Sequence, residues 1–209
     1  MSQPDMFSSK ANQFESLEDV IEALKRMKDD PLAGAGTNVV ISRGNPKAKL
    51  LIIGEAPGPE ENVKGKPFVG RAGQMLDKVL QSANFDPEKD VYITNSVFRM
   101  PPGEEEGKAF RKPTTEEIDY YRPYVFEIIR LVDPRVILLT GNVASQSVLK
   151  KTGITSLRGK WTEMDGRWIM PIFHPSYLLR NPVRTPGSPK ALMWEDIRRV
   201  RKKYDELSN

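Results

Sequence analysis

Two hydrophobic patterns alternate along the chain. Short continuous apolar runs, typical of strands that are buried on both faces, predict strands over residues 50–53, 91–94, 136–139 and 167–173. Apolar residues three or four positions apart mark one face of a helix and predict helices over residues 16–28, 71–83, 114–132, 142–150 and 190–207. Ser16 and the Thr114-x-x-Glu117 pair have the form of helix caps and support two of these helix starts.

This alternation of strands and helices predicts an α/β fold. Helices long enough to connect parallel strands indicate a single-domain, three-layer α/β/α architecture with a mostly parallel four-stranded central sheet. We expect residues 37–209 to form this domain, and residues 1–36 to form an N-terminal helix and connection packed on its core.

The unusual residues of the chain gather at the predicted carboxyl ends of the strands. In parallel sheets, ligands bind outside these ends. We therefore expect one site assembled from several strand ends. The residues concerned are Gly54 to Gly58, Asn95, Gly141-Asn142 and His174-Pro175-Ser176.

Composition narrows the chemistry that this site can perform. The 209 residues include no cysteine, which excludes disulfides, a thiolate nucleophile, a cysteine zinc site and a cysteine-held iron–sulfur cluster. No apolar run approaches the roughly 20 residues of a membrane helix, and the first residues lack the basic start and apolar core of a secretory signal. The net charge of +4 permits binding to a polyanion without requiring it. For the basic run 198–203, a solvated helix face is the favoured interpretation.

Two candidate residues follow the first and second predicted strands. Phe68, in the Gly- and Pro-rich segment after the first strand, is either an aromatic platform or a side chain that fills the core. That segment lacks the lysine–serine/threonine ending of a phosphate-binding P-loop. Asn95 either satisfies a turn or presents an amide whose donor and acceptor read the edge of a base.

The chain's single histidine, His174, ends an apolar strand and enters a loop bracketed by prolines, where structural and functional roles are equally favoured. Tyr177, Leu178 and Leu179 follow on that loop beside cations. Bulky apolar residues next to cations suit a wedge in a base stack, with the cations on phosphates. Alternatively, Leu178 and Leu179 begin a buried turn. The cations are Arg180, Arg184 and Lys190.

Five motifs occur in a fixed order: GEAPG-x-x-E, GKPFVGRAG, ITN, LTG and HPSYLLRNP. In this order they resemble the uracil-DNA glycosylase superfamily, most closely the family 4 enzymes of bacteria and archaea. The resemblance runs from about Gly44 to Arg199, and GNP, LRGKW and TPGSPK-x-x-x-W also fit it.

The resemblance implies a monofunctional DNA N-glycosylase, which flips uracil out of DNA and hydrolyses the N-glycosidic bond to leave an abasic site in base excision repair. Phe68 would stack on the base, Asn95 would hydrogen-bond its O4 and N3–H, and His174 would stabilise the departing anion at O2. Either Glu55 or Glu61 would orient the attacking water. The remaining residues of the expected uracil pocket are Gly54, Ala56, Pro57 and Gly58.

The resemblance also implies DNA contacts and a setting. Leu178 and Leu179 would fill the space that the base leaves, beside Tyr177 and Arg180. We expect a monomer that acts on uracil in single- or double-stranded DNA, meets a replication or repair partner, and binds no metal and no membrane. Such a protein would be cytoplasmic, associated with the nucleoid when bound to DNA, and encoded by a bacterium, an archaeon or a phage. The phosphates would be held by Ser176, Arg184, Ser188 and Lys190.

This sequence departs from the family in one large respect. Family 4 enzymes are typified by four cysteines that hold a [4Fe–4S] cluster, and the corresponding positions here fall near Met27, Asp30, Arg99 and Tyr121. We expect no cluster and no other cofactor, with Asp30, Arg99 and Tyr121 as candidates to hold the loop instead. The family has Asp where this chain has Asn62. The stretch GKAFRKPTT lacks the nucleophilic histidine of relatives that crosslink to DNA, so we expect no covalent capture.

Two other functions compete with this interpretation. A non-catalytic member of the fold, which binds DNA as a replication or repair partner, would account for the missing cluster positions. Retention of Glu55, Phe68, Asn95 and His174 argues against it. A nucleotide- or phosphate-binding α/β enzyme rests only on the Gly-rich turn, and binding of free nucleotide without DNA would favour it.

Overall fold

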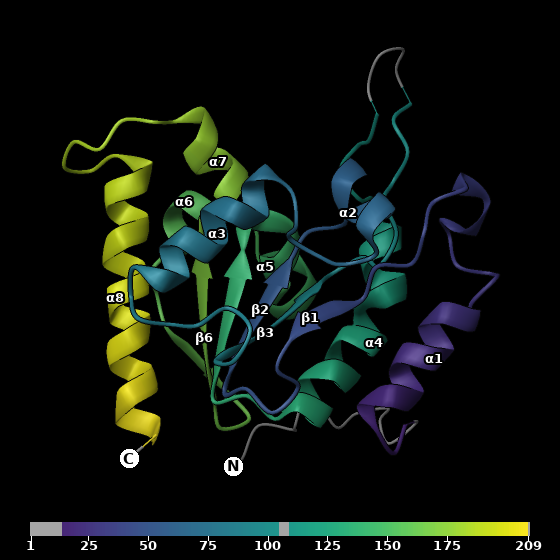
Figure 1. Ribbon diagram of the computed structural model, residues 1–209, viewed down its shortest axis with the longest axis horizontal. Helices are drawn as coiled ribbons and strands as arrows, with labels where there is room; N and C mark the ends of the chain where they lie inside the picture. The colour runs from purple at the N-terminus through teal and green to yellow at the C-terminus, as the bar shows by residue number, and fades with distance from the viewer. Residues whose placement is uncertain (1–13, 105–108, 209) are drawn as a thin grey trace.

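The structure, a computed structural model, describes residues 14–104 and 109–208. One six-stranded sheet in the order β1-β3-β2-β4-β6-β5 lies at its centre (Figure 1). The inner strands β3, β2, β4 and β6 are parallel, and the edge strands β1 and β5 are antiparallel to their neighbours. The strands are β1 Ser42–Gly44, β2 Leu50–Gly54, β3 Val91–Asn95, β4 Val136–Thr140, β5 Thr162–Met164 and β6 Arg167–Ile172.

The inner strands are the four that the apolar runs predict, so the α/β class and the mostly parallel sheet are confirmed. The two edge strands were not predicted and raise the strand number from four to six. Each of them is only three residues long and contains no buried residue. Neither therefore shows the continuous apolar run by which the inner strands are recognised.

Helices cover both faces of the sheet (Figure 1). α1, α4 and α5 contribute to the apolar core on one face, and α3, α7 and α8 to the core on the other. Within the described residues, no helix is long and apolar enough to cross a membrane. The helices are α1 Leu17–Arg26, α2 Pro59–Lys64, α3 Arg71–Gln81, α4 Thr115–Val132, α5 Gly141–Leu149, α6 Ile154–Leu157, α7 Pro175–Arg180 and α8 Pro189–Ser208, with a 3-10 turn η1 at Ala33–Ala35.

Alternation within the strands explains why their sequences are apolar throughout. Leu51 and Ile53 of β2 belong to the core beneath α1, α4 and α5, whereas Leu50 and Ile52 belong to the core beneath α3 and α8. All four side chains are fully buried. A strand covered on both faces has no side that faces solvent. Its sequence is therefore apolar throughout and does not alternate between apolar and polar residues, as that of a half-exposed strand does.

Only part of the predicted N-terminal segment, residues 14–36, is among the described residues. Residues 1–13 lie outside them. α1 packs against α4 in the same apolar core as the sheet, through Leu17, Val20 and Leu24. The predicted cap is present, because Ser16 Oγ accepts a hydrogen bond from the amide of Asp19 at 3.2 Å.

Candidate functional site

The carboxyl ends of the parallel strands bring the candidate residues together. Gly54 ends β2 directly beside Asn95, which ends β3. His174 follows β6, and its Cβ lies 3.2 Å from where a Cβ on Gly141, the residue directly after β4, would stand. Residues from four adjacent strand ends therefore meet at one edge of the sheet, as the sequence predicts.

Gly54 is the point on which two of these side chains converge. A Cβ placed on Gly54 would lie 2.2 Å from Oδ1 of Asn95 and 2.5 Å from Cε2 of Phe68. Contacts this short are impossible for real atoms, so any side chain here would displace the amide or the ring. Glycine at this position is required by the close approach of Asn95 and Phe68.

Asn95 is buried, with 2% of its surface exposed. No hydrogen bond joins its side chain to another of the described residues, although buried amides usually find partners. The turn after β3 is satisfied by other atoms: Ser96 donates both its amide and its hydroxyl to the carbonyl of Gly54, at 3.0 and 2.7 Å. The amide of Asn95 thus keeps its donor and acceptor for a ligand.

Phe68 is held in a strained backbone conformation. Its φ of 53° lies in the left-handed region, which for a bulky residue costs about 1–3 kcal/mol. Its carbonyl rests on α3, where a Cβ on Gly73 would lie 1.8 Å from the oxygen. The ring centroid is 6.0 Å from that of His174. The ring is only 7% exposed, yet it lies near His174 and Asn95. The same side chain therefore packs in the core and forms a wall of the site.

His174 caps α7 with its own ring. Nδ1 accepts a hydrogen bond from the amide of Ser176 at 3.2 Å and lies 2.8 Å from that residue's hydroxyl. An amide can only donate, so Nδ1 is unprotonated and the neutral ring carries its proton on Nε2. Burial, reinforced by the charges of Arg180 and Lys112, lowers the pKa of His174 to about 4. The ring is therefore neutral near pH 7, with an Nε2–H donor.

Glu55 follows Gly54 and is half-buried. Burial raises the pKa of its carboxyl group, and the charges of Lys112 and Arg180 partly oppose that shift. Within the described residues, its carboxylate accepts no hydrogen bond. Such a group has lone pairs available for a water molecule or a developing positive charge. Lys112, which influences both Glu55 and His174, was missed by sequence reasoning.

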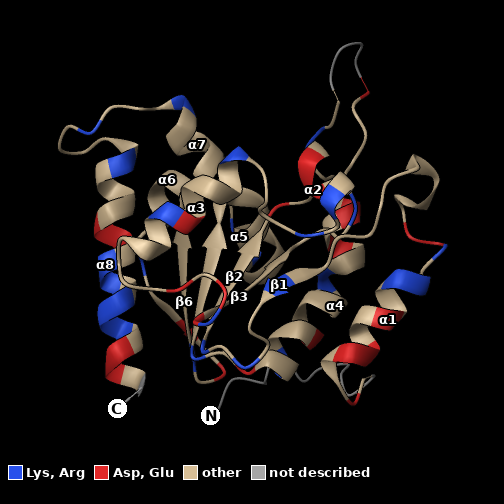
Figure 2. Ribbon diagram, in the orientation of Figure 1, with Lys and Arg blue, Asp and Glu red and all other residues tan. Residues whose placement is uncertain are grey.

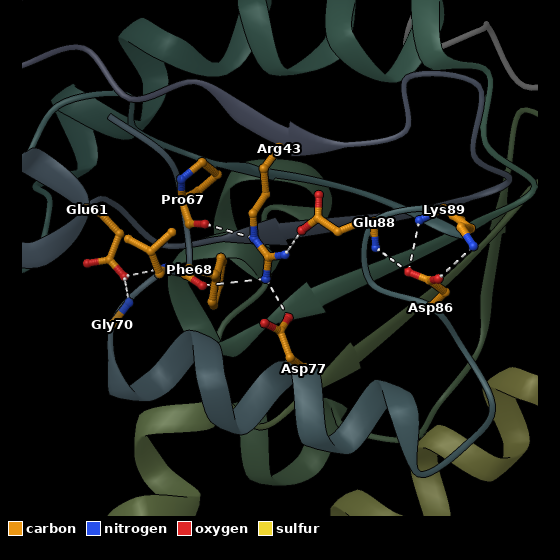
Figure 3. A network of polar contacts seen from close by, with 10 residues as sticks. Arg43, Glu61, Pro67, Phe68, Gly70, Asp77, Asp86, Glu88 and Lys89 are labelled. Atoms are coloured by element: carbon orange, nitrogen blue, oxygen red, sulfur yellow. Dashed lines mark hydrogen bonds and ion pairs between the residues drawn. The ribbon is translucent and has the colours of Figure 1, made fainter. Parts of the chain in front are cut away.

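Glu61 differs from Glu55 in having its oxygens occupied. Oε1 accepts from the amides of Val69 and Gly70 at 3.1 and 2.9 Å (Figure 3). Oε2 accepts from the amide of Gly58 at 3.2 Å. These bonds connect the start of α2 with the start of α3. The sequence left open which carboxylate serves the chemistry, and the geometry favours Glu55.

The rest of the first loop supports this arrangement. Gly58 is the N-cap of α2, and a Cβ there would lie 2.9 Å from Oε2 of Glu61. Pro57 is buried and Ala56 half-buried against the core. Asn62, where the family has Asp, accepts the amide of Asn38 at 2.7 Å through Oδ1. The amide side chain thus fastens α2 to residue 38.

The segment after His174 is a helix, α7, rather than the predicted loop. Its signal is present in the sequence as a capping residue followed by Pro175 at the first helical position. Within α7, Leu178 is 1% exposed and packs in the core, which contradicts its assignment as a wedge in this conformation. Tyr177 is 38% exposed and Leu179 half-buried. The burial of Leu178 agrees with the alternative of a buried turn, and its role toward DNA stays a prediction.

The predicted phosphate contacts are spread over the connection from α7 to α8. Figure 2 shows Lys and Arg at the end of α7, on this connection and near the start of α8. Arg180 and Arg184 are exposed, and Lys190 is half-buried. Ser188 accepts the amide of Ala191 at 3.4 Å and so helps to begin α8, while Ser176 is engaged with His174. In the basic run 198–203, several members point to solvent, as expected.

The four positions at which family 4 enzymes place cluster cysteines meet in space. Arg99 Nε lies 3.0 Å from Asp30 Oδ2, and Nη2 donates to the carbonyl of Met27 at 3.3 Å. The hydroxyl of Tyr121 donates to Asp30 Oδ1 at 2.5 Å. Because burial and the Asp30 hydrogen bond raise the pKa of Tyr121, this phenol stays protonated and remains a donor.

These groups do not fit a [4Fe–4S] cluster. Such clusters are held by thiolates, and the chain has no cysteine. The guanidinium of Arg99 occupies the space beside Asp30 and cannot ligate a metal. No group of three or more potential metal ligands occurs within residues 14–104 and 109–208. The positions form a closed polar network of side chains and backbone carbonyls.

Comparison with known proteins agrees with the ordered motifs. The family model described as Uracil DNA glycosylase superfamily matches residues 41–198. A type-4 uracil-DNA glycosylase of Thermotoga maritima is 36% identical over 190 residues, which are 90% of this chain and 94% of that protein. The type-4 enzyme of Archaeoglobus fulgidus is 35% identical over 178 residues, 80% of this chain and 85% of its own. A DNA polymerase of Bacillus phage SP01 is 34% identical over 162 residues, 78% of this chain and 16% of that protein. The resemblance drawn from the motifs is confirmed, and the chain belongs to the uracil-DNA glycosylase superfamily.

Proposed function

We propose that this protein is a monofunctional uracil-DNA glycosylase, which hydrolyses the bond between uracil and deoxyribose and leaves an abasic site for base excision repair. The observation that carries the proposal is that three unpaired groups stand at the carboxyl end of the sheet, two of them near the ring of Phe68. These groups are the amide of Asn95, Nε2 of His174 and the carboxylate of Glu55. The non-catalytic alternative is not favoured, because the chain is 32–36% identical to several type-4 uracil-DNA glycosylases.

Recognition begins with extrusion of the base, since uracil inside a duplex cannot reach these groups. The extruded ring stacks on Phe68 while Asn95 accepts from N3–H and donates to O4. Cytosine presents the opposite pattern, with an acceptor at N3 and a donor at C4, so the same amide orientation rejects it. A buried amide without a protein partner makes this discrimination strong, because a mismatched base would leave it unsatisfied.

Cleavage of the C1′–N1 bond leaves negative charge on uracil and positive character on the sugar. His174 donates from Nε2 to O2 of the leaving base, and a preorganised donor of this kind contributes about 3 kcal/mol. Its neutral state is suited to this task, since the ring stabilises the anion without having to give up a proton. Glu55 orients the water that attacks C1′ and stabilises the sugar cation. Glu61 holds the loop through backbone amides rather than acting on the water.

Two cations complete the site. Arg180 and Lys112 influence both Glu55 and His174, and we place them on the phosphates that flank the flipped nucleotide. Tyr177 and Leu179 are the candidates to occupy the gap in the base stack, with Leu178 packed beneath them. Lys112 is also the lysine to test as an imine-forming amine, because its charge acts on both site residues. The further phosphate contacts are Ser176, Arg184, Ser188 and Lys190.

The chain performs this reaction without an iron–sulfur cluster. The network of Asp30, Arg99 and Tyr121 fastens the connection after α1 to the segment after β3 and to α4, as a structural staple would. Protein purified from cells grown with ample iron should contain less than about 0.1 iron per chain, because every ligand thiolate is missing. Iron at four per chain with absorbance near 400 nm would contradict this.

A single-uracil oligonucleotide tests the function. The purified protein is incubated with labelled DNA in EDTA, followed by alkali, with a thymine-containing strand as control. Cleavage only at uracil and only after alkali supports a monofunctional glycosylase. Strand scission without alkali, or borohydride trapping lost in Lys112→Met, would indicate an imine mechanism. Retained DNA binding without any cleavage would return the prediction to the non-catalytic alternative.

Variants show whether the proposed groups perform the reaction. Glu55→Ala and His174→Ala should each lower the single-turnover rate by about 100-fold or more. Glu60→Ala is the matched control, because this neighbouring carboxylate is exposed on α2. An equal loss in all three variants would show damage to the loop rather than to the chemistry.

The cellular setting is also proposed. We expect a monomer that works in the cytoplasm on chromosomal or phage DNA. The similarity to part of a phage DNA polymerase supports a replication protein as a partner. Size-exclusion chromatography with light scattering tests the monomer, and pull-down with a replicative polymerase tests the partner.

A further inference from the structure

Arg43, on the edge strand β1, is a sheltered cation outside the groups discussed so far. Its side chain is only 7% exposed. A charge so far removed from water must be compensated, and here two carboxylates do so. Asp77 of α3 and Glu88, at 2.7 Å, both pair with the guanidinium (Figure 3).

The remaining donors of Arg43 point to the backbone that carries Phe68. Nε donates to the carbonyl of Pro67 at 3.1 Å, and Nη2 lies 3.5 Å from the carbonyl of Phe68 (Figure 3). The same nitrogen pairs with Asp77, so the guanidinium ties the residues before α3 to α3 itself. The planar fork of arginine suits this task, because it reaches several acceptors at fixed angles.

What this clamp holds is the strained part of the loop. Phe68 adopts a φ of 53°, a conformation that persists only where the surroundings enforce it. Glu61 fixes the backbone after Phe68, through the amides of Val69 and Gly70. Arg43 fixes the backbone before it, through Pro67. The ring is thereby set against Gly54 and His174 from both sides.

We propose that Arg43 is a positioning residue for the base-stacking ring of Phe68, and that it sets the affinity of the site for the extruded base. The proposal rests on the glycosylase function given above. A direct phosphate contact is inconsistent with this geometry, since the guanidinium is buried and already neutralised by Asp77 and Glu88. Arg43 acts through Phe68 and touches neither the base nor the DNA backbone.

The two carboxylates that pair with Arg43 differ in exposure, so they should differ in importance. The side chain of Asp77 is 31% exposed, whereas that of Glu88 is 68% exposed. The more sheltered partner is screened less by water, and it belongs to α3. Asp77→Asn should therefore weaken uracil binding more than Glu88→Gln does.

The test compares Arg43→Met and Arg43→Lys with Lys47→Met, a matched control that removes an exposed cation just beyond the same strand. Arg43→Met should raise the inhibition constant for free uracil and lower the single-turnover rate, each by about tenfold, the scale of one base–aromatic stack. Binding of uracil-free duplex should change less than about twofold. Arg43→Lys should restore part of the loss, and Lys47→Met should match the wild type.

A double-mutant cycle distinguishes positioning from general damage. Phe68→Leu removes the stacking ring, so adding Arg43→Met to it should cause no further loss in uracil affinity. Additive losses, or weaker binding of uracil-free DNA by Arg43→Met, would overturn the positioning role. If the wild type removes uracil and Arg43→Met has the same uracil affinity and rate, only this inference would be overturned. An inactive wild type would overturn it together with the glycosylase function.

Discussion

Nδ1 of His174 accepts a hydrogen bond from the backbone amide of Ser176, 3.2 Å away. The donor cannot exchange roles with the ring, so this single contact selects the tautomer with its proton on Nε2. The Nε2–H group that would hydrogen-bond the departing uracil anion is therefore oriented by the first turn of α7. The proposed role of His174 thus depends on a helix that sequence reasoning took for a loop.

The pH dependence of activity follows from two opposite pKa shifts. Burial lowers the pKa of His174 from 6.5 to about 4 and raises that of Glu55 above 4.5. His174 is therefore already neutral at pH 6.5, and activity should show no transition there. As the pH falls further, kcat/KM should decline through protonation of Glu55.

Single-turnover rates from pH 4.5 to 8.5 check this expectation. The acid limb should disappear in Glu55→Gln, whose low residual rate should be nearly independent of pH. A transition near pH 6.5 that persists in Glu55→Gln would assign the limb to His174 instead. The free energy of unfolding should also depend on pH. Between pH 6.5 and 4 His174 is protonated in the unfolded chain but not in the native protein, which favours unfolding. Over this range the wild type should therefore lose more stability than His174→Asn.

Glu55 and Glu61 should respond to the same substitution in different ways. Glu55→Gln should lower the single-turnover rate by about 100-fold or more and leave the melting temperature unchanged or higher, because it removes an unpaired, half-buried charge. Glu61→Gln replaces an acceptor of three amides and should destabilise the fold by about 1–2 kcal/mol. Thermal unfolding and uracil release, measured on both variants, separate the roles. A larger rate loss in Glu61→Gln at full stability would reverse the assignment.

The polar network at the former cluster positions should be a stability element. Asp30 is 1% exposed at its side chain, so Arg99→Met leaves a buried carboxylate without its cation and should cost about 3 kcal/mol. Tyr121→Phe removes one donor and should cost about 1–2 kcal/mol. Arg26→Met, at an exposed pair on α1, should change stability by less than about 0.5 kcal/mol.

Denaturant unfolding with and without a chelator measures these differences. Equal unfolding midpoints in the two conditions are expected for every variant. If Arg99→Met were as stable as wild type, the connection after α1 would be held by apolar packing alone, and the network would lose its role as a staple.

How much of the fold and the candidate site could be predicted depended on how far apart the contacting residues lie along the chain. The inner strands and long helices were predicted, because their apolar periodicity is local. The meeting of Asn95, Phe68 and His174 also followed, since parallel strands end at one edge. Glu55 and Glu61 could not be separated, because their difference lies in amides that Glu61 reaches eight and nine residues away.

Other features depended on contacts that no local pattern reveals. Arg43 bonds to residues 24 to 45 positions away, and its strand has no apolar run. Lys112 acts through its charge on Glu55 and His174, which lie 57 and 62 positions away along the chain. α7 is only six residues long, too short for helical periodicity, although its capping signal was present. The cluster positions were located through the resemblance, but their bonding pattern was not.

Arg180 should contribute to DNA affinity whatever the base sequence of the DNA, because it contacts phosphates in the proposed complex. Arg180→Gln should weaken binding of uracil-free and uracil-containing duplexes alike, and reduce the slope of log Kd against log salt by about 1. Because its charge lowers the pKa of Glu55, its removal should also shift the acid limb to higher pH. Arg135→Gln is the matched control, since this exposed arginine precedes β4 at the opposite edge of the sheet. An unchanged salt slope would remove Arg180 from the phosphate contacts.

Tyr177 and Leu178 are neighbours in α7 with opposite exposure, 38% and 1%. Leu178→Ala should destabilise the fold by about 2–5 kcal/mol, as expected for a cavity in the core. Tyr177→Ala removes a ring that lies 5.1 Å from that of Phe173 and should cost only about 1 kcal/mol of stability. It should nevertheless slow uracil release from duplex DNA, because nothing then occupies the gap in the stack. Single-stranded substrate, which has no gap to fill, should be processed by Tyr177→Ala at nearly the wild-type rate. A loss on both substrates would place Tyr177 in the chemistry, whereas a stable Leu178→Ala with a duplex-specific defect would return the wedge to Leu178.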